Sequence, residues 1–312
     1  MSNIDLPSAI FLMGPTASGK TALAVELAQK LNTEIISVDS ALVFKGMDIG
    51  TAKPTLSERQ GIPHHLIDIL DPAESFSTGS FRKQALALMD DISRRGKVPV
   101  LVGGTMLYFN ALFNGLAELP EANPEVRQKL DEELVQLGKQ AMHDRLKSID
   151  PESAQRIHPN DPQRVQRALE VYEISGQPIT QFFREAQKNK IPFKKIKLII
   201  APEDRKQLHE KIALRFKLMI KQGLIDEVNA LYLRGDLTDK MPSVRAVGYR
   251  QAWSYLQGEY DLETMIEKGI IATRQLAKRQ FTWLRREQDA LHFASSELSL
   301  ADKVLEQIKD DL

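Results

Sequence analysis

A glycine-rich loop near the start of the chain constrains the fold more than any other segment. Residues 14–21 read Gly-Pro-Thr-Ala-Ser-Gly-Lys-Thr and match the pattern G-x-x-x-x-G-K-[ST]. The apolar run Ala9–Met13 precedes the loop, and leucines at helical spacing follow it from Lys20 to Leu31. A strand, a glycine loop and a helix in this order form a phosphate-binding loop, whose backbone amides surround phosphate oxygens. The sequence therefore predicts an enzyme that binds a diphosphate or a triphosphate.

All eight residues of this phosphate loop are candidate phosphate ligands. They are Gly14, Pro15, Thr16, Ala17, Ser18, Gly19, Lys20 and Thr21. Lys20 supplies a positive charge, and the Thr21 hydroxyl is a candidate ligand for Mg²⁺. Hydrolases with such a loop hold Mg²⁺ with an acid at the end of an apolar strand. Here the strand Pro99–Val102 ends at Gly103-Gly104-Thr105 instead, which weakens the hydrolase interpretation.

The alternation of strands and helices predicts the fold class. Apolar segments typical of strands are Ala9–Met13, Glu34–Val38, Pro99–Val102 and Phe193–Ala201. Helical periodicity separates the first three, at Lys20–Leu31 and Phe76–Arg95, whereas 124–183 shows helices broken by prolines. We expect an α/β protein with a P-loop-type parallel sheet flanked by helices. Residues 1–115 and 193–312 would form the catalytic core, and 116–192 a helical insertion that contacts its macromolecular substrate.

The amino-acid composition limits the class of protein, its metal sites and its binding partners. Apolar residues make up 42% and charged residues 27%, as in ordinary globular proteins. The absence of cysteine excludes disulfides and thiolate metal sites. Basic and acidic residues number 42 each, which argues against a strongly basic nucleic-acid coat but leaves room for a local basic groove. Because residues 1–7 lack the features of a signal peptide and no segment approaches the ~20 apolar residues of a membrane span, we expect a cytoplasmic protein without membrane contact.

A second site is predicted where the next strand ends, at Asp39. Carboxyl ends of parallel strands face the ligand crevice, so Asp39 and residues 103–105 should converge on the phosphate loop. A carboxylate beside a phosphate site can accept a proton or bind Mg²⁺, although a turn residue is the alternative interpretation. Zinc binding by the pair His64-His65 is not predicted, since adjacent side chains diverge on a strand and no third ligand is evident.

A series of short blocks extends this pattern in order over most of the chain. The blocks are Gly14–Thr21, Asp39-Ser40, Met47–Pro54, Leu101–Tyr108, Asn160–Glu170, Val247–Gln251 and Thr273–Gln280. The loop alone is shared by many families. In combination, the blocks closely resemble the tRNA dimethylallyltransferases.

The resemblance implies an activity. A dimethylallyl group would move from dimethylallyl diphosphate to the exocyclic amino group of the adenosine 3′ of a tRNA anticodon, with Mg²⁺ as cofactor and diphosphate as leaving group. It implies catalytic roles for Asp39, Thr105 and Arg127, and a diphosphate contact for Arg215. A carboxylate such as Asp39 would accept a proton from the amino group, which is a poor nucleophile. The expected partner is the tRNA anticodon stem-loop, bound by a monomer.

The resemblance also places tRNA contacts along the whole chain. They are Asp39, Ser40, Ala41, Leu42, Thr105, Arg127, Gln163, Arg164, Val165, Gln166, Arg167, Arg245, Ala246, Val247, Gly248, Tyr249, Arg250, Lys278, Arg279, Gln280, Phe281, Thr282, Trp283, Leu284 and Arg285. Many family members carry Gln and Tyr where this chain has Leu42 and Phe44. Leu42 can therefore make only apolar or backbone contacts.

Some of these positions allow a structural interpretation too. Arg164 and Arg167 share one helix face, and the predicted helix from Ile270 to Arg286 has an apolar side and a basic outer side. A solvated face would look the same. The aromatic residues Trp253, Phe281 and Trp283 could stack on bases, but packing in the core is the favoured interpretation.

Two other functions compete with prenyl transfer. One is a small-molecule or nucleotide kinase that uses ATP, and the other is a non-catalytic RNA-binding module. The absence of an acid at the end of the strand Pro99–Val102 and the paired arginines of the insertion disfavour the kinase. Asp39 at a strand end disfavours the non-catalytic module.

Overall fold

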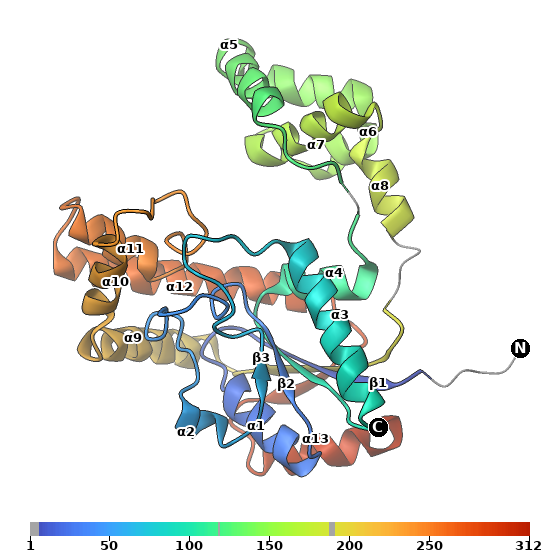
Figure 1. The fold of residues 1–312 in the computed structure, drawn as a ribbon, viewed down its shortest axis with the longest axis vertical. Coiled ribbons are helices and arrows are strands. Elements are labelled where there is room, and N and C mark those ends of the chain that lie inside the picture. The colour runs from blue at the N-terminus through green and yellow to red at the C-terminus, as the bar shows by residue number, and fades with distance from the viewer. Residues whose placement is uncertain (1–5, 118, 187–190) are drawn as a thin grey trace, which may run out of the picture. The chain divides into compact units, whose positions relative to one another are not determined.

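A parallel sheet of six strands forms the centre of the larger of two units in this computed structural model (Figure 1). The strands are β1 (Ser8–Met13), β2 (Ile35–Val38), β3 (His64–His65), β4 (Val100–Gly103), β5 (Lys194–Ala201) and β6 (Leu291–Ala294). Their order across the sheet is β3-β2-β4-β1-β5-β6. β1 lies between β4 and β5, so that Ile10 is opposite both Val100 and Ile196. The predicted parallel sheet is confirmed.

The structure describes residues 6–117, 119–186 and 191–312. Met1–Phe109 and Pro192–Leu312 form the unit with the sheet, here called the sheet unit, and Asn110–Ile191 forms the helical unit. The sequence placed these divisions after residue 115 and before residue 193. Residues 1–5, part of the segment used to argue against a signal peptide, lie outside the described residues, as do 118 and 187–190 of the predicted insertion.

Helices cover both faces of the sheet, because its strands are apolar on both sides. The helices of the sheet unit are α1 (Lys20–Lys30), α2 (Leu56–Arg59), α3 (Thr78–Arg94), α4 (Met106–Asn114, across the boundary), α9 (Arg205–Lys221), α10 (Leu224–Tyr232), α11 (Tyr249–Leu256), α12 (Leu262–Leu284) and α13 (Leu300–Ile308), followed by the 3-10 helix η1 (Lys309–Asp311). On one face, Ile10 and Leu12 pack with Leu27 of α1 and Val304 of α13. On the other face, Phe11 meets an aromatic ring of α4 edge to face. The flanking helices expected from the alternating pattern are confirmed.

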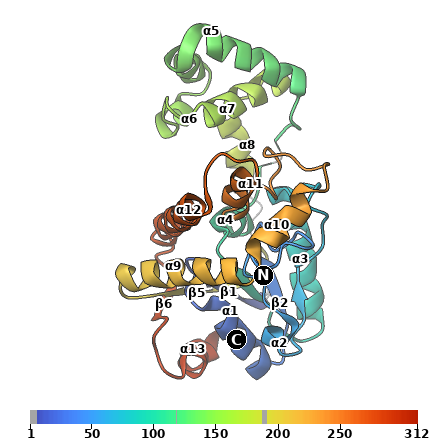
Figure 2. The ribbon, with the colours of Figure 1, turned by 90° about the vertical axis from the view of Figure 1, so that its left-hand side faces the viewer.

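Helices α9 to α12 pack on one another beside the sheet (Figure 2). Their shared core contains Phe216, Val228, Trp253 and Met265, and it also holds Phe44 from the segment after β2. Trp253 is 5% exposed, which confirms that it belongs to the core. The segment that follows β2 is therefore fixed from the C-terminal half of the chain.

Two strands, β3 and β6, were not predicted from the sequence. β3 contains only two residues, and β6 is an edge strand whose first residue, Leu291, is 37% exposed. Neither has the run of apolar residues that predicts a buried strand. The expectation of a mostly helical segment after Arg205 holds except for β6.

The helical unit owes its element boundaries to proline. Its helices are α5 (Pro124–Ile149), α6 (Pro151–Arg156), α7 (Pro162–Ser175) and α8 (Ile179–Ala186). Three of them begin with proline directly after a side-chain cap, supplied by Asn123, Asp150 and Asp161. Proline suits the first helical position, where its missing N–H would have no helical partner. Inside α5, Gly138 with φ 81° and ψ 167° kinks the helix.

In the part of the chain that the structure describes, every helix is too short or too polar to cross a membrane.

Candidate active site

A cavity of about 670 Å³ lies at the carboxyl ends of β1, β2 and β4. Its lining includes the phosphate loop after β1, Asp39 after β2, and Gly103 and Gly104 at the end of β4. β4 pairs with both β1 and β2, so the three strand ends are neighbours. Asp39, Gly103 and Gly104 converge on the phosphate loop as expected, whereas Thr105, expected with them, is not among the described residues that line the cavity.

The phosphate loop is shaped to receive an anion. It enters α1 at Gly19, whose φ of 84° favours glycine, and no side chain caps the helix there within the described residues. The first amides of α1 are consequently open to a ligand, and the helix dipole adds a partial positive charge. Lys20 Nζ donates to the carbonyl of Pro15 at 2.6 Å and to Ser18 Oγ at 3.4 Å, which keeps the ammonium group inside the loop.

A second cation reaches the same loop from α9. Arg215 donates from NH2 to Thr16 Oγ1 at 2.8 Å and lines the cavity. Burial and the neighbouring Arg215 guanidinium lower the pKa of Lys20 to about 7, while Asp39 acts in the opposite direction. Burial also lowers the pKa of Arg215. Two partly desolvated cations beside open amides make a site that a multiply charged anion would stabilise.

The Asp39 carboxylate lies at the edge of this site and is held by backbone N–H groups. Its Oδ1 accepts the backbone N–H of Ala41 at 2.8 Å and that of Leu42 at 3.4 Å. Its Oδ2 has no hydrogen-bond partner in the described part of the chain. Burial raises the pKa of Asp39, although the two N–H groups and the nearby cations oppose that rise. Thr105 Oγ1 accepts the N–H of Ser40 at 3.0 Å, which ties the ends of β2 and β4 together.

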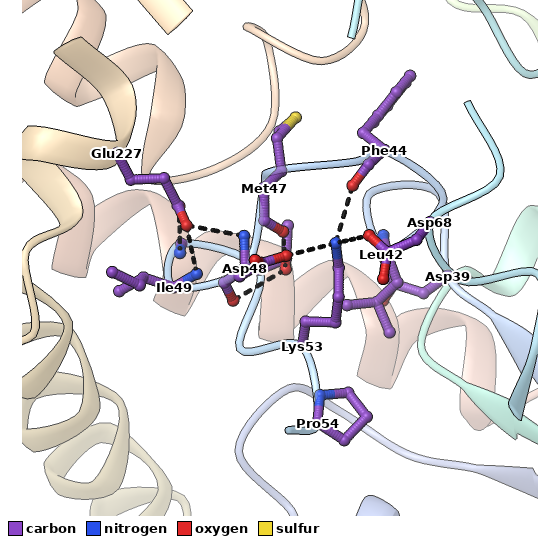
Figure 3. Close-up of polar contacts among 12 residues, drawn as sticks. Asp39, Leu42, Phe44, Met47, Asp48, Ile49, Lys53, Pro54, Asp68 and Glu227 are labelled. Atoms are coloured by element: carbon purple, nitrogen blue, oxygen red, sulfur yellow. Dashed lines mark hydrogen bonds and ion pairs between the residues drawn. The ribbon is translucent and has the colours of Figure 1, made fainter. Parts of the chain in front are cut away.

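The segment 41–54, which follows Asp39 and contributes several residues to the cavity lining, is held in place by the buried Lys53 (Figure 3). The Lys53 side chain is 3% exposed. Its ammonium group donates to the carbonyl of Phe44 at 2.8 Å, to Asp48 Oδ1 at 2.6 Å and to Asp68 Oδ1. Asp68 in turn donates its backbone N–H to the Leu42 carbonyl at 3.1 Å. All three ammonium protons are satisfied, and the segments that contain Phe44, Asp48 and Asp68 are joined.

Glu227 of α10 binds backbone N–H groups of the same segment (Figure 3). Its Oε2 accepts the N–H groups of Asp48 and Ile49, both at 2.8 Å, and its Oε1 accepts that of Gly50 at 3.1 Å. The Tyr249 hydroxyl donates to the same carboxylate. Tyr249, expected among the tRNA contacts, is 1% exposed, so its side chain faces the protein interior.

The other expected tRNA contacts of the sheet unit divide by burial. Exposed are Ser40, Arg245, Arg250, Lys278, Arg279, Thr282 and Arg285; half-buried are Asp39, Ala41, Leu42, Thr105, Ala246, Val247, Phe281 and Trp283; buried are Gly248, Gln280 and Leu284. Ala246 and Val247 line the cavity. Phe281 and Ala17 of the phosphate loop both pack against the cluster of Leu208, Ile212 and Ala277, so α12 is anchored near the loop by its apolar side. Trp283 lies beneath the Arg286 guanidinium, 4.9 Å from ring centroid to Cζ.

In the helical unit, the expected contacts surround a buried carboxylate. Glu170 has no solvent exposure. It accepts hydrogen bonds from Arg127 Nε at 2.9 Å, from Arg167 NH1 at 2.7 Å and from the Asn123 N–H at 3.0 Å. The side chains of Arg127 and Arg167 remain 49% and 30% exposed. Glu170 thus fixes two arginines whose outer parts stay accessible.

The rest of the Gln163–Arg167 block has mixed surroundings. Gln163 and Arg164 are exposed, and Arg164 pairs with Asp161 at 3.0 Å. Val165 is buried in the core of the unit. Gln166 donates to Asp131 Oδ1 at 2.7 Å.

The metal predictions concern Thr21 and the two histidines. Thr21 is exposed in the first turn of α1 and lines the cavity. His64 Nδ1 lies 2.8 Å from the Ile62 carbonyl, and His65 Nε2 lies 2.9 Å from Glu34 Oε2. No group of three or more His, Asp or Glu side chains placed to hold a metal occurs among the residues that the structure describes.

Sequence reasoning did not find the structural contacts of four side chains that organise the two units. Lys53 and Glu170 lie inside the quoted blocks, but nothing in those blocks separates them from their neighbours. Glu227 lies outside every block. Gln280 was predicted only as a tRNA contact, and the structure adds that it is 7% exposed and bonds to the backbone of the phosphate loop. Glu227 and Gln280 bond to segments about 180 and 260 positions away, which no spacing rule relates to them.

Comparison with known proteins identifies a single family. The IPP transferase family matches residues 42–287. The tRNA dimethylallyltransferase of Methylococcus capsulatus is 54% identical over 99% of both chains. That of Thioalkalivibrio sulfidiphilus is 60% identical over 89% of this chain and 87% of its own.

Solved structures agree with the fold. The tRNA isopentenylpyrophosphate transferase of Bacillus halodurans is similar with a TM-score of 0.71 and 39% identity, over 97% of this chain and 95% of its own. A eukaryotic dimethylallyltransferase, studied in crystallographic snapshots of its action on tRNA, gives a TM-score of 0.83 at 30% identity, over 98% of this chain and 79% of its own.

Proposed function

The chain belongs to the IPP transferase family, and we propose that it transfers a dimethylallyl group from dimethylallyl diphosphate to tRNA. The acceptor is the exocyclic amino group of the adenosine 3′ of the anticodon, and diphosphate is released. One observation carries this proposal: the anion-binding loop with Lys20 and the carboxylate of Asp39 line the same cavity. A prenyl diphosphate needs the first, and an amine acceptor needs the second.

Asp39 is the general base in this proposal. The amino nitrogen forms a bond to the allylic carbon, the bond from that carbon to the diphosphate oxygen breaks, and one amino proton passes to the Asp39 carboxylate. The adenine amino group is a weak nucleophile, because its lone pair is delocalised into the ring. Burial raises the pKa of Asp39, and a more basic carboxylate accepts this proton more readily. Thr105 is the second catalytic residue that we assign, as a hydrogen-bond partner of the acceptor.

The phosphate loop stabilises the leaving group. Negative charge grows on the diphosphate oxygens as the carbon–oxygen bond breaks, and Lys20, Arg215 and the open amides of α1 surround that charge. Binding of the anion would restore the lowered pKa of Lys20, because an opposite charge favours the ammonium form. This coupling between the cation and its ligand predicts pH-dependent diphosphate binding.

Mg²⁺ is the proposed cofactor. The ion is satisfied by few protein oxygens when a substrate supplies phosphate oxygens and water fills the other positions. The exposed hydroxyl of Thr21 in the cavity lining fits this requirement. When bound, Mg²⁺ would neutralise part of the charge on the departing diphosphate.

The tRNA would be held by many separate contacts. Chemistry on the edge of an adenine requires the base to leave its stack, at a cost of a few kcal/mol. Exposed cations at Arg245, Arg250, Lys278, Arg279 and Arg285 can contact phosphates of the anticodon stem-loop. In the helical unit we assign the same role to Arg127 and the Gln163–Arg167 block. Leu42 contributes apolar or backbone contacts only.

We assign this activity to a monomer in the cytoplasm. The phosphate loop and Asp39 of the same chain line one cavity, so a monomer carries both groups that the proposed chemistry uses. The tRNA substrate is the reason for the cytoplasmic assignment.

The direct test supplies both substrates. The protein is incubated with an unmodified tRNA anticodon stem-loop, labelled dimethylallyl diphosphate and Mg²⁺, and the RNA is digested to nucleosides. We expect label on adenosine. A stem-loop with guanosine at the acceptor position is the matched control and should stay unlabelled. The absence of labelled adenosine, or transfer of phosphate from labelled ATP in a parallel reaction, would overturn the proposal.

A further inference from the structure

Gln280 joins the phosphate loop to the end of β4 through its side-chain amide. The Thr16 N–H donates to Gln280 Oε1 at 2.9 Å, and Gln280 Nε2 donates to the Gly104 carbonyl at 2.9 Å. The orientation of the amide is fixed by chemistry, since only its oxygen can face an N–H and only its nitrogen can face a carbonyl. One buried side chain therefore sets the spacing between two backbone segments of the cavity lining.

The surroundings of Gln280 are built for this contact. A Cβ atom on Gly104 would lie 2.3 Å from Gln280 Nε2, so a larger residue at that position would push the amide away. Gln280 is 7% exposed and lines the cavity. Next to Gly104 is Thr105, which bonds to Ser40 beside Asp39. The amide thus links the diphosphate side of the cavity with its acceptor side.

Because of this contact, the amides of the phosphate loop fall into two groups: those bonded to the protein and those open to a ligand. The Thr16 N–H is engaged by Gln280, and the Thr16 hydroxyl accepts from Arg215. Thr16 is therefore fixed by the protein, whereas the helix-start amides after Gly19 remain open to an anion. Loss of the Gln280 amide would leave those open amides, Lys20 and Arg215 in place.

We propose that Gln280 is a positioning residue that sets the phosphate loop relative to the Gly104-Thr105 turn, and with it the distance between allylic carbon and acceptor amine. This inference rests on the proposed prenyl transfer. Gln280 would contact neither reacting atom. Its effect should appear in the rate of the bound complex rather than in the affinity for either substrate, because misplacement of reacting groups by about 1 Å can cost ~100-fold in rate.

The test compares Gln280→Ala with wild type in three measurements. Single-turnover transfer at saturating stem-loop and dimethylallyl diphosphate should fall by about 100-fold. The Kd for inorganic diphosphate with Mg²⁺ and the Kd for the stem-loop should each change by less than about 3-fold. Thr33→Val is the matched control, since it removes a buried hydrogen bond to the Val98 carbonyl outside the cavity lining. It should lower thermal stability and leave the single-turnover rate unchanged.

Gln280→Glu adds a pH signature that a purely structural role would not give. Its carboxylate can still accept the Thr16 N–H, but the second oxygen repels the Gly104 carbonyl until it gains a proton. The rate relative to wild type should therefore rise as the pH falls from 8 to 6. Gly104→Ala should reproduce the loss seen in Gln280→Ala, because its Cβ displaces the amide.

Two results would overturn the inference. One is a single-turnover rate within about 3-fold of wild type in both Gln280 variants. The other is a loss of stem-loop affinity with full rate at saturating RNA, which would make Gln280 an RNA contact. Failure of the proposed function would instead appear in the wild-type enzyme, as an absence of transfer.

Discussion

Arg127 donates from Nε to Glu170 at 2.9 Å, and that carboxylate is completely shielded from solvent. Burial of a charge is costly unless its partners are well placed. Here the partners are Arg127 and Arg167, both expected to contact tRNA and both still partly exposed. Glu170 therefore sets the direction of two cations at once.

Glu170→Gln should weaken both the helical unit and its RNA contacts. The change removes the charge that strengthens the hydrogen bonds from Arg127 and Arg167, and we expect a loss of about 2 kcal/mol in the free energy of unfolding. Stem-loop affinity should fall several-fold, while diphosphate affinity stays the same. Glu173→Gln on the same helix is the control, because its partly exposed pair with Arg145 should contribute less than ~1 kcal/mol. Equal losses in the two variants, measured by urea unfolding, would contradict this role.

The same carboxylate predicts a pH dependence. Burial alone would raise the pKa of Glu170, but hydrogen bonds from Arg167 and Arg127 outweigh it and hold the pKa below its ordinary value of 4.5. A lowered pKa in the fold means that the stabilisation is fully present above about 4.5 and is lost as the pH falls through the lower, folded value. The stability gap between wild type and Glu170→Gln should therefore close on acidification below pH 4.5. A stability gap that widened as the pH fell would contradict the lowered pKa of Glu170.

Diphosphate binding should depend on the protonation of Lys20. Burial, together with Arg215, lowers its pKa to about 7, and the ammonium form is the one that attracts the anion. Above pH 7, binding must therefore take up a proton at Lys20, and the log of the affinity should fall by up to about one per pH unit. Lys20→Met removes this titration and serves as the reference for the ionisation of diphosphate itself. Calorimetric titrations from pH 6 to 9 measure the difference, and parallel curves for the two proteins would contradict the prediction.

Asp39→Asn should separate chemistry from binding. Asparagine keeps the size of the side chain and its acceptor oxygen for the Ala41 N–H, but it cannot take the amino proton. The single-turnover rate should fall by at least ~100-fold, with stem-loop affinity changed by less than ~10-fold. Since burial raises the pKa of Asp39, the wild-type rate should decline as the pH falls toward that raised value, and the variant should lack this limb. A variant with full rate and poor RNA affinity would make Asp39 an RNA-orienting residue.

Removal of one exposed cation from α12 and one from its C-cap should change only the electrostatic part of RNA binding. If Lys278 and Arg285 each contact a phosphate, the double alanine variant should lower the slope of log affinity against log salt by roughly 1.4 to 1.8. Lys30 and Arg94, exposed in the last turns of α1 and α3, make a matched control pair with equal charge. We expect an unchanged slope for the control. The same slope in both double variants would mean that Lys278 and Arg285 are only solvated.

Local pattern was sufficient where function depends on segments close in sequence. The phosphate loop needs a strand, two glycines and a helix start, and all of these lie between Ala9 and Leu31. The placement of Asp39 followed from the rule that parallel strands end at one edge. The confirmed convergence on one cavity required no knowledge of side-chain contacts.

Such rules could not predict the long-range contacts that hold this site together. Glu227 meets the turn at Asp48–Gly50 across nearly 180 positions, and Gln280 meets Thr16 across more than 260. A periodic pattern reports which face of an element is buried, not which distant backbone group its polar side chain will satisfy. The same reason explains Tyr249: its block was found, but the Glu227 carboxylate that draws its hydroxyl inward was not.

The sheet order has a consequence for how the chain is made. β1 is synthesised long before its partner β5, because Ser8 pairs with Lys194, which lies 186 positions later. At about 5 to 20 residues per second, one edge of β1 waits roughly 10 to 40 s on the ribosome for its partner. During that time the helical unit, which has a core of its own, emerges and can fold. The strand that carries the phosphate loop is thus among the last to be enclosed, and a nascent chain interrupted before residue 201 would present an unpaired apolar strand edge to chaperones and to other chains.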